Sequence, residues 1–354
     1  MCDQNLKLYG DGIHDDSVAI QQLLDKRGLI TIKDGTYLIK KPLIIHDDTN
    51  LVLSKNAIMY LADGANCSLI DNDGLYTKTT NKNITIEGGI WFGNHSKQER
   101  EYIADENQPC VYEKYVENSL TVIMMRFVHV ENFVIKNVTF KDPTSFAIHI
   151  ADVKYFTVEN VHLDYDLKKP NMDGVHLQGP ARFGRIKNVF GNANDDHVAL
   201  CANGTARSEV TRGVIEDVDI DGVYCDNGYT GVRLLSRGDA VKNIRIKNVH
   251  GKFRYFAVSF THHYPLRDDM PVKFENIHVS DLYLDKNEEE PFVSFQDGAL
   301  IYFENGVNCE NVLIEDVYKV ENQGKKLPIL KISETAQLKN VKINNVFGEE
   351  DKTL

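Results

Sequence analysis

The sequence predicts an all-β protein: a single-stranded parallel β-helix of about ten coils with one capping helix at its N-terminal end. A short phrase recurs along the chain, as in NFVIKNVTF from residue 132, YFTVENVHL from 155, NIRIKNVHG from 243 and NVKINNVFG from 340. Its apolar positions alternate with polar ones and are mostly Val, Ile and Phe, which is the pattern of a β-strand. Repeats of roughly 20 to 50 residues are typical of solenoids, in which each unit buries its apolar side against its neighbours.

An Asn or Asp near the end of each phrase marks the length of the repeat. The first six markers are 23 to 31 residues apart, and intervals of 40 and 29 follow, at Asn137, Asn160, Asn188, Asp217, Asn248, Asn276, Asp316 and Asn345. Asn tolerates turn conformations, and its amide can hydrogen-bond along a stack. We therefore expect these residues at the corners of the coils, with a structural role.

Only one segment has convincing helical spacing, in GDGIHDDSVAIQQLLDKRG near the start. Asp15 or Asp16 can cap this helix and Gly28 can end it. Its apolar face is formed by Val18, Ile20, Leu23 and Leu24. An open solenoid end exposes apolar core, so we expect the helix to cover it, and we favour this role over a metal site at His14 and the neighbouring acids.

Composition narrows the class of protein. A formal charge of −12 argues against a nucleic-acid-binding surface, and no apolar run is long enough to span a bilayer. The opening MCDQNLKLYGDG lacks the basic and apolar segments of a signal peptide, so we expect a cytoplasmic protein, or a secreted one if a signal peptide was removed. The six cysteines lack CxxC spacing, which suits reduced thiols.

We expect residues 1–354 to form one β-helix domain, with residues 1–50 as the N-terminal cap and first strands. Residues 92–120 break the repeat as an insertion loop. Its surroundings carry several aromatic residues that suggest a wall over one side of a groove, namely Trp91, Phe92, Tyr102, Tyr112 and Tyr115. If the loop closes one end of the groove, only the end of a chain-like ligand can enter the groove.

The segment GNANDDHVALCANG holds the clearest candidate site. Asp195 and Asp196 are adjacent, although successive strand residues point to opposite faces, so the chain must bend at residues 194–195 for both to face one cleft. Asp173 lies 22 and 23 residues earlier, about one coil. Clustered carboxylates force their titrations apart, leaving one protonated and the others ionised. Across one coil step the carboxyl groups could lie about 6 to 9 Å apart with room for a water, or closer together, and the spacing alone allows both distances.

These motifs resemble glycoside hydrolase family 28, the polygalacturonases and rhamnogalacturonases of the pectin-lyase-like superfamily of right-handed β-helices. That family carries Asn-x-Asp and, one coil later, Asp-Asp, which PNMDGVHLQGP and NANDDHVAL match at Asn171, Asp173, Asp195 and Asp196. The resemblance implies hydrolysis of a pectin-like or related oligo- or polysaccharide by single-displacement inversion. Asp195 would be the general acid, and Asp173 with Asp196 would activate water. Neither a cofactor nor a metal ion is needed.

Two elements of the family pattern are missing. The family's Gly-His-Gly has no counterpart, and Thr230 in GYTGV stands where its His would be. In TGVRLLSRGD, Arg233 matches the Arg of the family's Arg-Ile-Lys, while Leu235 takes the Lys position. Because that Arg and Lys hold an acidic sugar in family members, the differences put polygalacturonic acid in doubt as the substrate.

Further residues are candidates for substrate contacts. Arg233 is a candidate sugar contact or a surface salt bridge, and His176 can face the cleft or the core. His197 is a candidate second-layer or packing residue. Tyr264, in the loop FTHHYPLRDD, can stack on a sugar or lie in an exposed loop.

Two other functions remain open. A polysaccharide lyase or epimerase on the same scaffold would use calcium held by the three aspartates, with Arg233 as base. A β-helix adhesin or phage-tail module would bind glycans without turnover. The sequence leaves the oligomeric state open.

Overall fold

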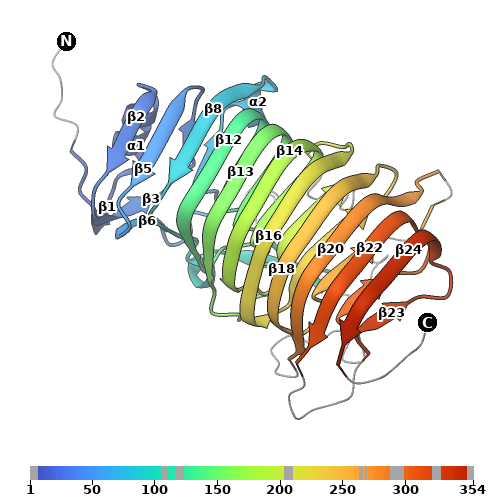
Figure 1. The fold of residues 1–354 in the computed structure, drawn as a ribbon. Coiled ribbons are helices and arrows are strands. Elements are labelled where there is room, and N and C mark those ends of the chain that lie inside the picture. Colours follow the sequence, from blue (N-terminus) through green and yellow to red (C-terminus); the bar gives the residue numbers. More distant parts are fainter. Residues whose placement is uncertain are drawn as a thin grey trace.

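The chain winds into coils whose strands pair in parallel with the equivalent strands of the coils before and after (Figure 1). This computed structural model describes residues 7–104, 111–115, 123–202, 210–262, 266–267, 269–287, 299–320 and 328–348, with only the main chain at 100–104 and 111–115. The predicted parallel β-helix is confirmed, and the described residues hold eleven consecutive rungs of its longest sheet. These rungs are β2 (Gly28–Ile32), β5 (Thr49–Leu53), β8 (Asn81–Glu87), β12 (Met125–Lys141), β13 (Ile148–Asp164), β14 (Val175–Asn192), β16 (Ile215–Gly228), β18 (Val241–Phe253), β20 (Val272–Lys286), β22 (Val307–Lys319) and β24 (Gln337–Phe347).

Shorter strands complete the coils on two further faces. One face starts from β1 (Asp11–Asp15), β3 (Gly35–Ile39), β6 (Ala57–Leu61) and β9 (Ile90–Phe92), and the last residues of the long strands continue it. The other, which we call the β15 face, combines the first residues of β12, β13 and β14 with seven short strands. These are β4 (Leu43–Ile45), β7 (Ile70–Asn72), β15 (Asp196–Ala202), β17 (Thr230–Ser236), β19 (Val258–Thr261), β21 (Ile301–Phe303) and β23 (Leu330–Ile332).

Alternation along each strand sends one set of side chains into the solenoid. In β13, for example, Ile148, Ile150, Phe156 and Val158 are buried in one continuous core, and their equivalents on the next coils stack on them. Because neighbouring rungs are ~4.8 Å apart, each coil's apolar residues are covered by those of the coils on either side. This stacking makes the outward positions of successive coils line up as well.

The Asn and Asp markers lie at corners, as predicted, but they belong to two corners. All eight have a left-handed main chain, with φ between 51° and 57°. Asn160 Nδ2 donates to Asn137 Oδ1 at 2.9 Å at one corner, whereas Asn276 Nδ2 donates to Asn243 Oδ1 at 3.0 Å at the other. Asp217 lies on the second corner too, in line with Asn243. The two corners look alike in sequence because both place an Asn or Asp before an inward Val or Ile.

The N-terminal helix α1 (Ser17–Leu24) packs Ile20 and Leu24 into the core, so it covers the end of the solenoid as expected. The predicted apolar face is wrong at Val18, which is 61% exposed. Asp15 Oδ1 accepts a hydrogen bond from the Ser17 main-chain N–H at 2.9 Å, while Asp16 turns back to bind the main chain of residues 9 and 10. The first strands are therefore joined to the helix by both aspartates.

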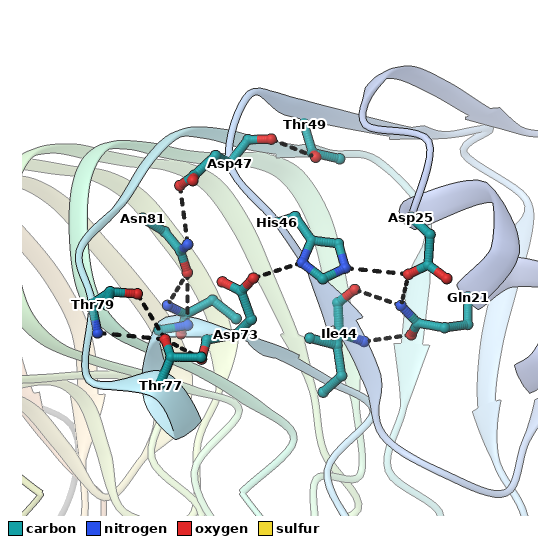
Figure 2. Close-up of polar contacts among 12 residues, drawn as sticks. Gln21, Asp25, Ile44, His46, Asp47, Thr49, Asp73, Thr77, Thr79 and Asn81 are labelled. Carbon is teal, nitrogen blue, oxygen red and sulfur yellow. Dashed lines mark hydrogen bonds and ion pairs between the residues drawn. The ribbon is translucent and has the colours of Figure 1, made fainter.

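A polar network joins this cap to the following coils (Figure 2). Gln21 in α1 accepts from and donates to the main chain of Ile44, at 2.7 and 2.9 Å. The His46 ring lies between Asp73, 2.6 Å from Nδ1, and Asp25, 3.2 Å from Nε2. Asp73 precedes the short helix α2 (Gly74–Thr77), so the network spans from α1 to the coil that carries β7 and β8.

The predicted insertion contains a 3₁₀ turn, η1 (His95–Lys97), and an antiparallel pair of strands, β10 (Arg100–Ala104) and β11 (Val111–Tyr115). Among the described residues no helix has the length and apolar character needed to cross a membrane. Within the described residues no disulfide joins Cys67, Cys201, Cys225 or Cys309.

Candidate active site

Two adjacent coils of the β15 face bring Asp173 and Asp196 together. Asp173 lies two residues before β14, and Asp196 is the first residue of β15. Val175 pairs with Val198, and the Gly174 N–H donates to the Asp196 carbonyl at 2.8 Å, so both aspartates lie at the same end of the strands. One carboxylate oxygen from each of Asp173, Asp195 and Asp196 lies within 4.8 Å of the others. The structure thus confirms that Asp173 lies beside Asp195 and Asp196 across one coil step.

Close packing explains the glycine that follows Asp173. A β-carbon on Gly174 would lie 2.6 Å from the main-chain oxygen of His197 on the next coil and 2.7 Å from a Leu163 methyl. Only a residue without a side chain lets the two coils approach this closely. Gly174 therefore sets the short distance between the carboxylates of the two coils.

The chain bends at residues 194–195, as the adjacent pair requires. Asn194 holds this bend: its Nδ2 donates to the carbonyls of Leu167 and Lys169, and its Oδ1 accepts from Nη2 of Arg254 at 2.8 Å. The same Nη2 donates to the Ala193 carbonyl at 3.2 Å. Arg254 follows β18 and thus reaches back from a later coil to fix the turn that presents Asp195 and Asp196.

Arg233 provides a positive charge at the cluster. It lies on β17, in register with Ala199 of β15, and its Nη1 is 3.3 Å from Asp196 Oδ2 and 3.9 Å from Asp195 Oδ1. Its side chain is only 14% exposed, so the surface salt bridge considered from the sequence is instead a largely buried ion pair. Thr230 and Leu235, at the positions of the missing family His and Lys, lie on this same strand and are buried.

On the other side of the cluster, His176 faces Asp173. His176 Nδ1 is 2.7 Å from Asp173 Oδ2, and the imidazole ring stacks on Phe146 with centroids 4.2 Å apart. His149, on the preceding coil, packs edge-on to His176 at 5.4 Å. Burial lowers the pKa of His176 to about 4 and that of His149 to about 3, so both rings are neutral near pH 7.

The carboxylates differ in exposure and share a strong electrostatic coupling. Asp195 is the most accessible, with 20% of its side chain exposed, against 4% for Asp173 and 3% for Asp196. Burial raises the pKa of Asp195 well above its usual range, and the charges of Asp196 and Asp173 raise it further. Burial and the charge of Asp196 likewise raise the pKa of Asp173, against the opposing effect of Arg233. The cluster therefore retains protons at pH values where an isolated carboxyl group is ionised.

One oxygen from each carboxylate lies within 4.8 Å of the others, which agrees with the shorter of the two distances that the spacing allows and not with about 6 to 9 Å. The same three side chains have the donor type and spacing that a cation requires. Two chemistries are thus compatible with the cluster: acid–base catalysis by the carboxyl groups themselves, and binding of a divalent cation.

The other predicted contacts fall in different places. His197 is fully buried, with Nδ1 2.9 Å from the Thr230 carbonyl and Nε2 3.0 Å from the Gly191 carbonyl, so it is a packing residue that joins coils, one of the roles expected from the sequence, and its ring is not exposed for a substrate contact. Asn171 is exposed, with a left-handed main chain, and its Nδ2 donates to Ser145 Oγ at 3.4 Å. Tyr264 lies outside the described residues.

The aromatic wall predicted around the insertion is wrong at Trp91. This ring is fully buried in the core, and its Nε1 donates to the Gly88 carbonyl at 3.2 Å, because residue 91 is an inward position of β9. Phe92 packs beside Tyr60, with ring centroids 5.1 Å apart. The side chains of Tyr102, Tyr112 and Tyr115 lie outside the described residues.

Several buried polar atoms around the cluster have no hydrogen-bond partner within the described part of the chain. They include Asp195 Oδ1, Asp196 Oδ1, His176 Nε2, Thr230 Oγ1 and Ser259 Oγ. Buried polar groups are nearly always paired in native proteins, so a concentration of unpaired ones at one place indicates a site that receives a polar molecule. Sequence reasoning missed His149 and Arg254, which belong to this region through contacts between coils and carry no local motif.

Comparison with known proteins agrees with this arrangement. The structure of endo-xylogalacturonan hydrolase from Aspergillus tubingensis aligns with a TM-score of 0.66 at 14% identity, covering 96% of this chain and 91% of that one. The family 28 exopolygalacturonase of Yersinia enterocolitica aligns with a TM-score of 0.58 at 16% identity, covering 98% and 78%. These likenesses confirm the right-handed β-helix.

A curated relative has a different description. Plasmin and fibronectin-binding protein A of Streptococcus pneumoniae (strain ATCC BAA-255 / R6) is 32% identical over 184 residues, which is 47% of this chain and only 24% of that protein. The family model described as "Glycosyl hydrolases family 28" matches residues 108–353, a segment that includes all three clustered aspartates and Arg233. Since this match covers well over half of the sequence, the chain belongs to glycosyl hydrolase family 28.

Proposed function

We propose that this protein is a glycoside hydrolase that cleaves a pectin-like or related oligo- or polysaccharide at the cluster of Asp173, Asp195 and Asp196. The observation that supports this most is the cluster itself, in which three carboxyl groups share a buried site with one guanidinium. Metal-free glycoside hydrolysis needs one protonated carboxyl group and one ionised carboxylate at the same bond. The three carboxyl groups and the guanidinium of Arg233 provide a setting in which one carboxyl group can be protonated while another is ionised.

Asp195 suits the role of general acid. It is the most accessible of the three carboxyl groups, and its raised pKa lets it keep a proton at pH values where an isolated carboxyl group has lost it. In the reaction it donates that proton to the glycosidic oxygen as the bond from this oxygen to the anomeric carbon breaks. The leaving sugar departs with a new hydroxyl group.

Asp196 and Asp173 suit the activation of water. Asp196 forms an ion pair with Arg233, and Asp173 accepts a hydrogen bond when His176 donates from Nδ1. A water held by these two carboxyl groups attacks the anomeric carbon from the opposite side and gives its proton to the carboxylate. The outcome is inversion, the stereochemistry implied by the family resemblance.

The substrate class and mode of action are also part of the proposal. Two solved structures with this fold are described as an exopolygalacturonase and an endo-xylogalacturonan hydrolase, both acting on pectic material by name. An insertion containing the β10–β11 pair interrupts the coils before β12, and an exo mode would follow if it closes one end of the groove. Product analysis distinguishes the modes, because an exo enzyme releases one size of product from the start.

The direct test is a screen of pectic and host-glycan oligosaccharides for new reducing ends, with Asp195→Asn as the inactive variant. General acid catalysis contributes about 10²- to 10⁴-fold, so we expect the variant to lose at least that much of kcat. Asp226→Asn is the matched control, because Asp226 is exposed and lies outside the cluster. Equal turnover by Asp195→Asn and the wild type would contradict the proposal.

A second candidate function is glycan or protein binding without turnover. The observation that favours it is the 32% identity to a protein named for binding plasmin and fibronectin, together with the Thr and Leu at the positions of the family His and Lys. If the protein were a pure binding module, Asp195→Asn would still bind the ligand, and the wild-type protein would release no reducing ends. The same screen therefore separates the two functions.

A further inference from the structure

Outward-facing positions of the β15 face line up in register on both sides of the carboxylates. They alternate with core residues, so their side chains point away from the solenoid interior. We call this line the site row, and it consists of Arg126, His149, His176, Ala199, Arg233, Ser259 and Tyr302, one on each successive coil. A sugar at the aspartate cluster lies against the middle of this row.

The two guanidinium groups of the site row already have acidic partners. Arg233 contacts Asp196 and Asp195 at 3.3 and 3.9 Å. Arg126 Nε donates to Asp71 Oδ1 at 2.9 Å within a buried ion pair. A carboxylate on the substrate would have to compete with these pairs, and it would add a negative charge beside three aspartates and one guanidinium.

A third guanidinium, that of Arg254, is engaged differently. Its Nη2 binds the main-chain carbonyl of Ala193 and the side chain of Asn194, and it lies 5.7 Å from the centre of the Tyr229 ring. Its Nε and Nη1 have no partner within the described residues, but both atoms are buried. Arg254 is therefore the residue to vary if an acidic sugar does bind.

The two histidines of the site row present acceptors. Gln178 donates from Nε2 to the Thr211 carbonyl at 2.8 Å, so its Oε1, 2.7 Å from His149 Nε2, must accept, and His149 carries its proton on Nε2. His149 Nδ1 is thus a bare acceptor, buried and without a hydrogen-bond partner among the residues that the structure describes. When His176 donates from Nδ1 to Asp173, its buried Nε2 is a second bare acceptor. A sugar hydroxyl can donate to such atoms, whereas a carboxylate has no proton to give.

On the coil after Arg233, the two outward residues of β19 are also uncharged. Ser259, in register with Arg233, and Thr261, in register with Leu235, are both buried neutral residues. Ser259 Oγ has no partner in the described part of the chain, while Thr261 Oγ1 donates to the Leu234 carbonyl at 3.3 Å. A hydroxyl group at this position can bind a sugar hydroxyl, but it supplies no charge for a carboxylate.

From these contacts we propose that the glycosyl residue in the reactive subsite is uncharged, and that its hydroxyl groups are read by neutral acceptors of the site row. The proposal rests on the hydrolase function above and narrows its substrate to chains whose cleaved residue is a neutral sugar. A uronate is disfavoured because, among the described residues, both guanidinium groups of the site row are already paired with aspartates, and because a carboxylate leaves the imidazole acceptors unpaired.

The test compares matched oligosaccharides that differ only in the carboxyl group: oligogalacturonates and their carboxyl-reduced, galactose-containing counterparts. Binding is measured by calorimetry with Asp195→Asn, at low and high salt, and turnover by reducing ends with the wild type. We expect the neutral member to bind and react roughly 100-fold better, as like-charge juxtaposition implies, and its affinity to be insensitive to salt.

A preference of the same size for the uronate, weakened by salt, would overturn the inference and leave the hydrolase function intact. In that case Arg254→Met should abolish the preference if Arg254 receives the carboxylate. Absence of both binding and Asp195-dependent turnover for either member would reject the inference, and the wider screen of pectic and host-glycan oligosaccharides decides the hydrolase function separately. The two failures are thus distinguishable.

Discussion

His176 Nδ1 lies 2.7 Å from Asp173 Oδ2, and both side chains are almost completely buried. The imidazole is held in place by stacking on Phe146 at 4.2 Å. The ring therefore offers a fixed N–H to the carboxylate that the proposed mechanism uses to activate water. His176 affects the chemistry through Asp173, so we assign it as a positioning residue, in addition to the substrate contact that the sequence suggests and that we propose for its Nε2.

Replacing His176 tests this role. His176→Ala removes the donor, which disfavours the charged form of Asp173 and raises its pKa, so the acidic limb of kcat/KM should move to higher pH. A hydrogen bond to a charged group contributes about 1.5–3 kcal/mol, which corresponds to a loss of roughly 10- to 100-fold in kcat. His176→Asn retains an N–H near the position of Nδ1 and should recover much of the rate and the pH profile. Equal losses in both variants with an unmoved profile would mean that His176 only packs.

The raised pKa values of Asp195 and Asp173 predict a pH-dependent cost in stability. For a group with a raised folded-state pKa, the stabilising contribution is present below the unfolded pKa of about 3.9 and is lost as pH rises through the folded value. Asp195→Asn imitates the protonated state at every pH. The variant should therefore be more stable than the wild type at pH 8, by about 1–2 kcal/mol, and the difference should shrink towards pH 4.

Urea unfolding at the two pH values measures this difference, with Asp226→Asn as the control for a loss of charge at the surface. If Asp195→Asn were less stable than the wild type at pH 8, the carboxylate would be contributing favourable interactions in its charged form. The general-acid assignment would then lose its electrostatic basis.

The fold was predictable because its signals are local and repeated. Each coil repeats the alternation of inward Val, Ile or Phe. Because the coils stack in register, every copy of the pattern indicates the same strand, as at Val138, Val161 and Val189. The marker spacing was harder to interpret, since Asp217 and Asn276 belong to a second corner with the same local sequence. Val18 was placed wrongly because an eight-residue helix covering an end buries only a narrow stripe.

The site was predictable only where it follows the repeat. Asp173 and Asp196 are one coil apart in sequence and in space, so spacing was enough to bring them together. Arg254 contacts Asn194 across 60 residues, and no motif marks either partner. His149 and Trp91 required knowledge of which strand residues face inward, which depends on the exact register of short strands. Contacts between coils set the details that the sequence pattern leaves open.

Removal of metal ions separates hydrolysis from the lyase or epimerase alternative. The three aspartates can hold a cation, and a lyase would depend on it. We expect reducing-end release to be unchanged in EDTA and not stimulated by added calcium, because the carboxyl groups supply the acid and base themselves. Loss of activity in EDTA, recovered by calcium and accompanied by an ultraviolet-absorbing unsaturated product, would favour the lyase.

Arg254 should control the rate without contributing to the chemistry. Its Nη2 ties Ala193 and Asn194, the turn that presents Asp195 and Asp196, to a later coil. Asn194 keeps its bonds to the carbonyls of Leu167 and Lys169 in Arg254→Met, so the turn remains formed but loses one of its anchors. Misplacement of catalytic groups by about 1 Å can cost as much as 100-fold in rate, so we expect kcat to fall roughly 10- to 100-fold.

The stability of Arg254→Met should change little, because an apolar side chain of similar length replaces a buried cation whose Nε and Nη1 are unpaired. Arg245→Met is the matched control: Arg245 lies on β18, the strand that Arg254 follows, but it is exposed and pairs with Asp219 at 2.7 Å, away from the cluster. Kinetics and thermal unfolding of the two variants check the prediction. A full rate in Arg254→Met would show that the bonds of Asn194 to residues 167 and 169 are sufficient to position the two aspartates.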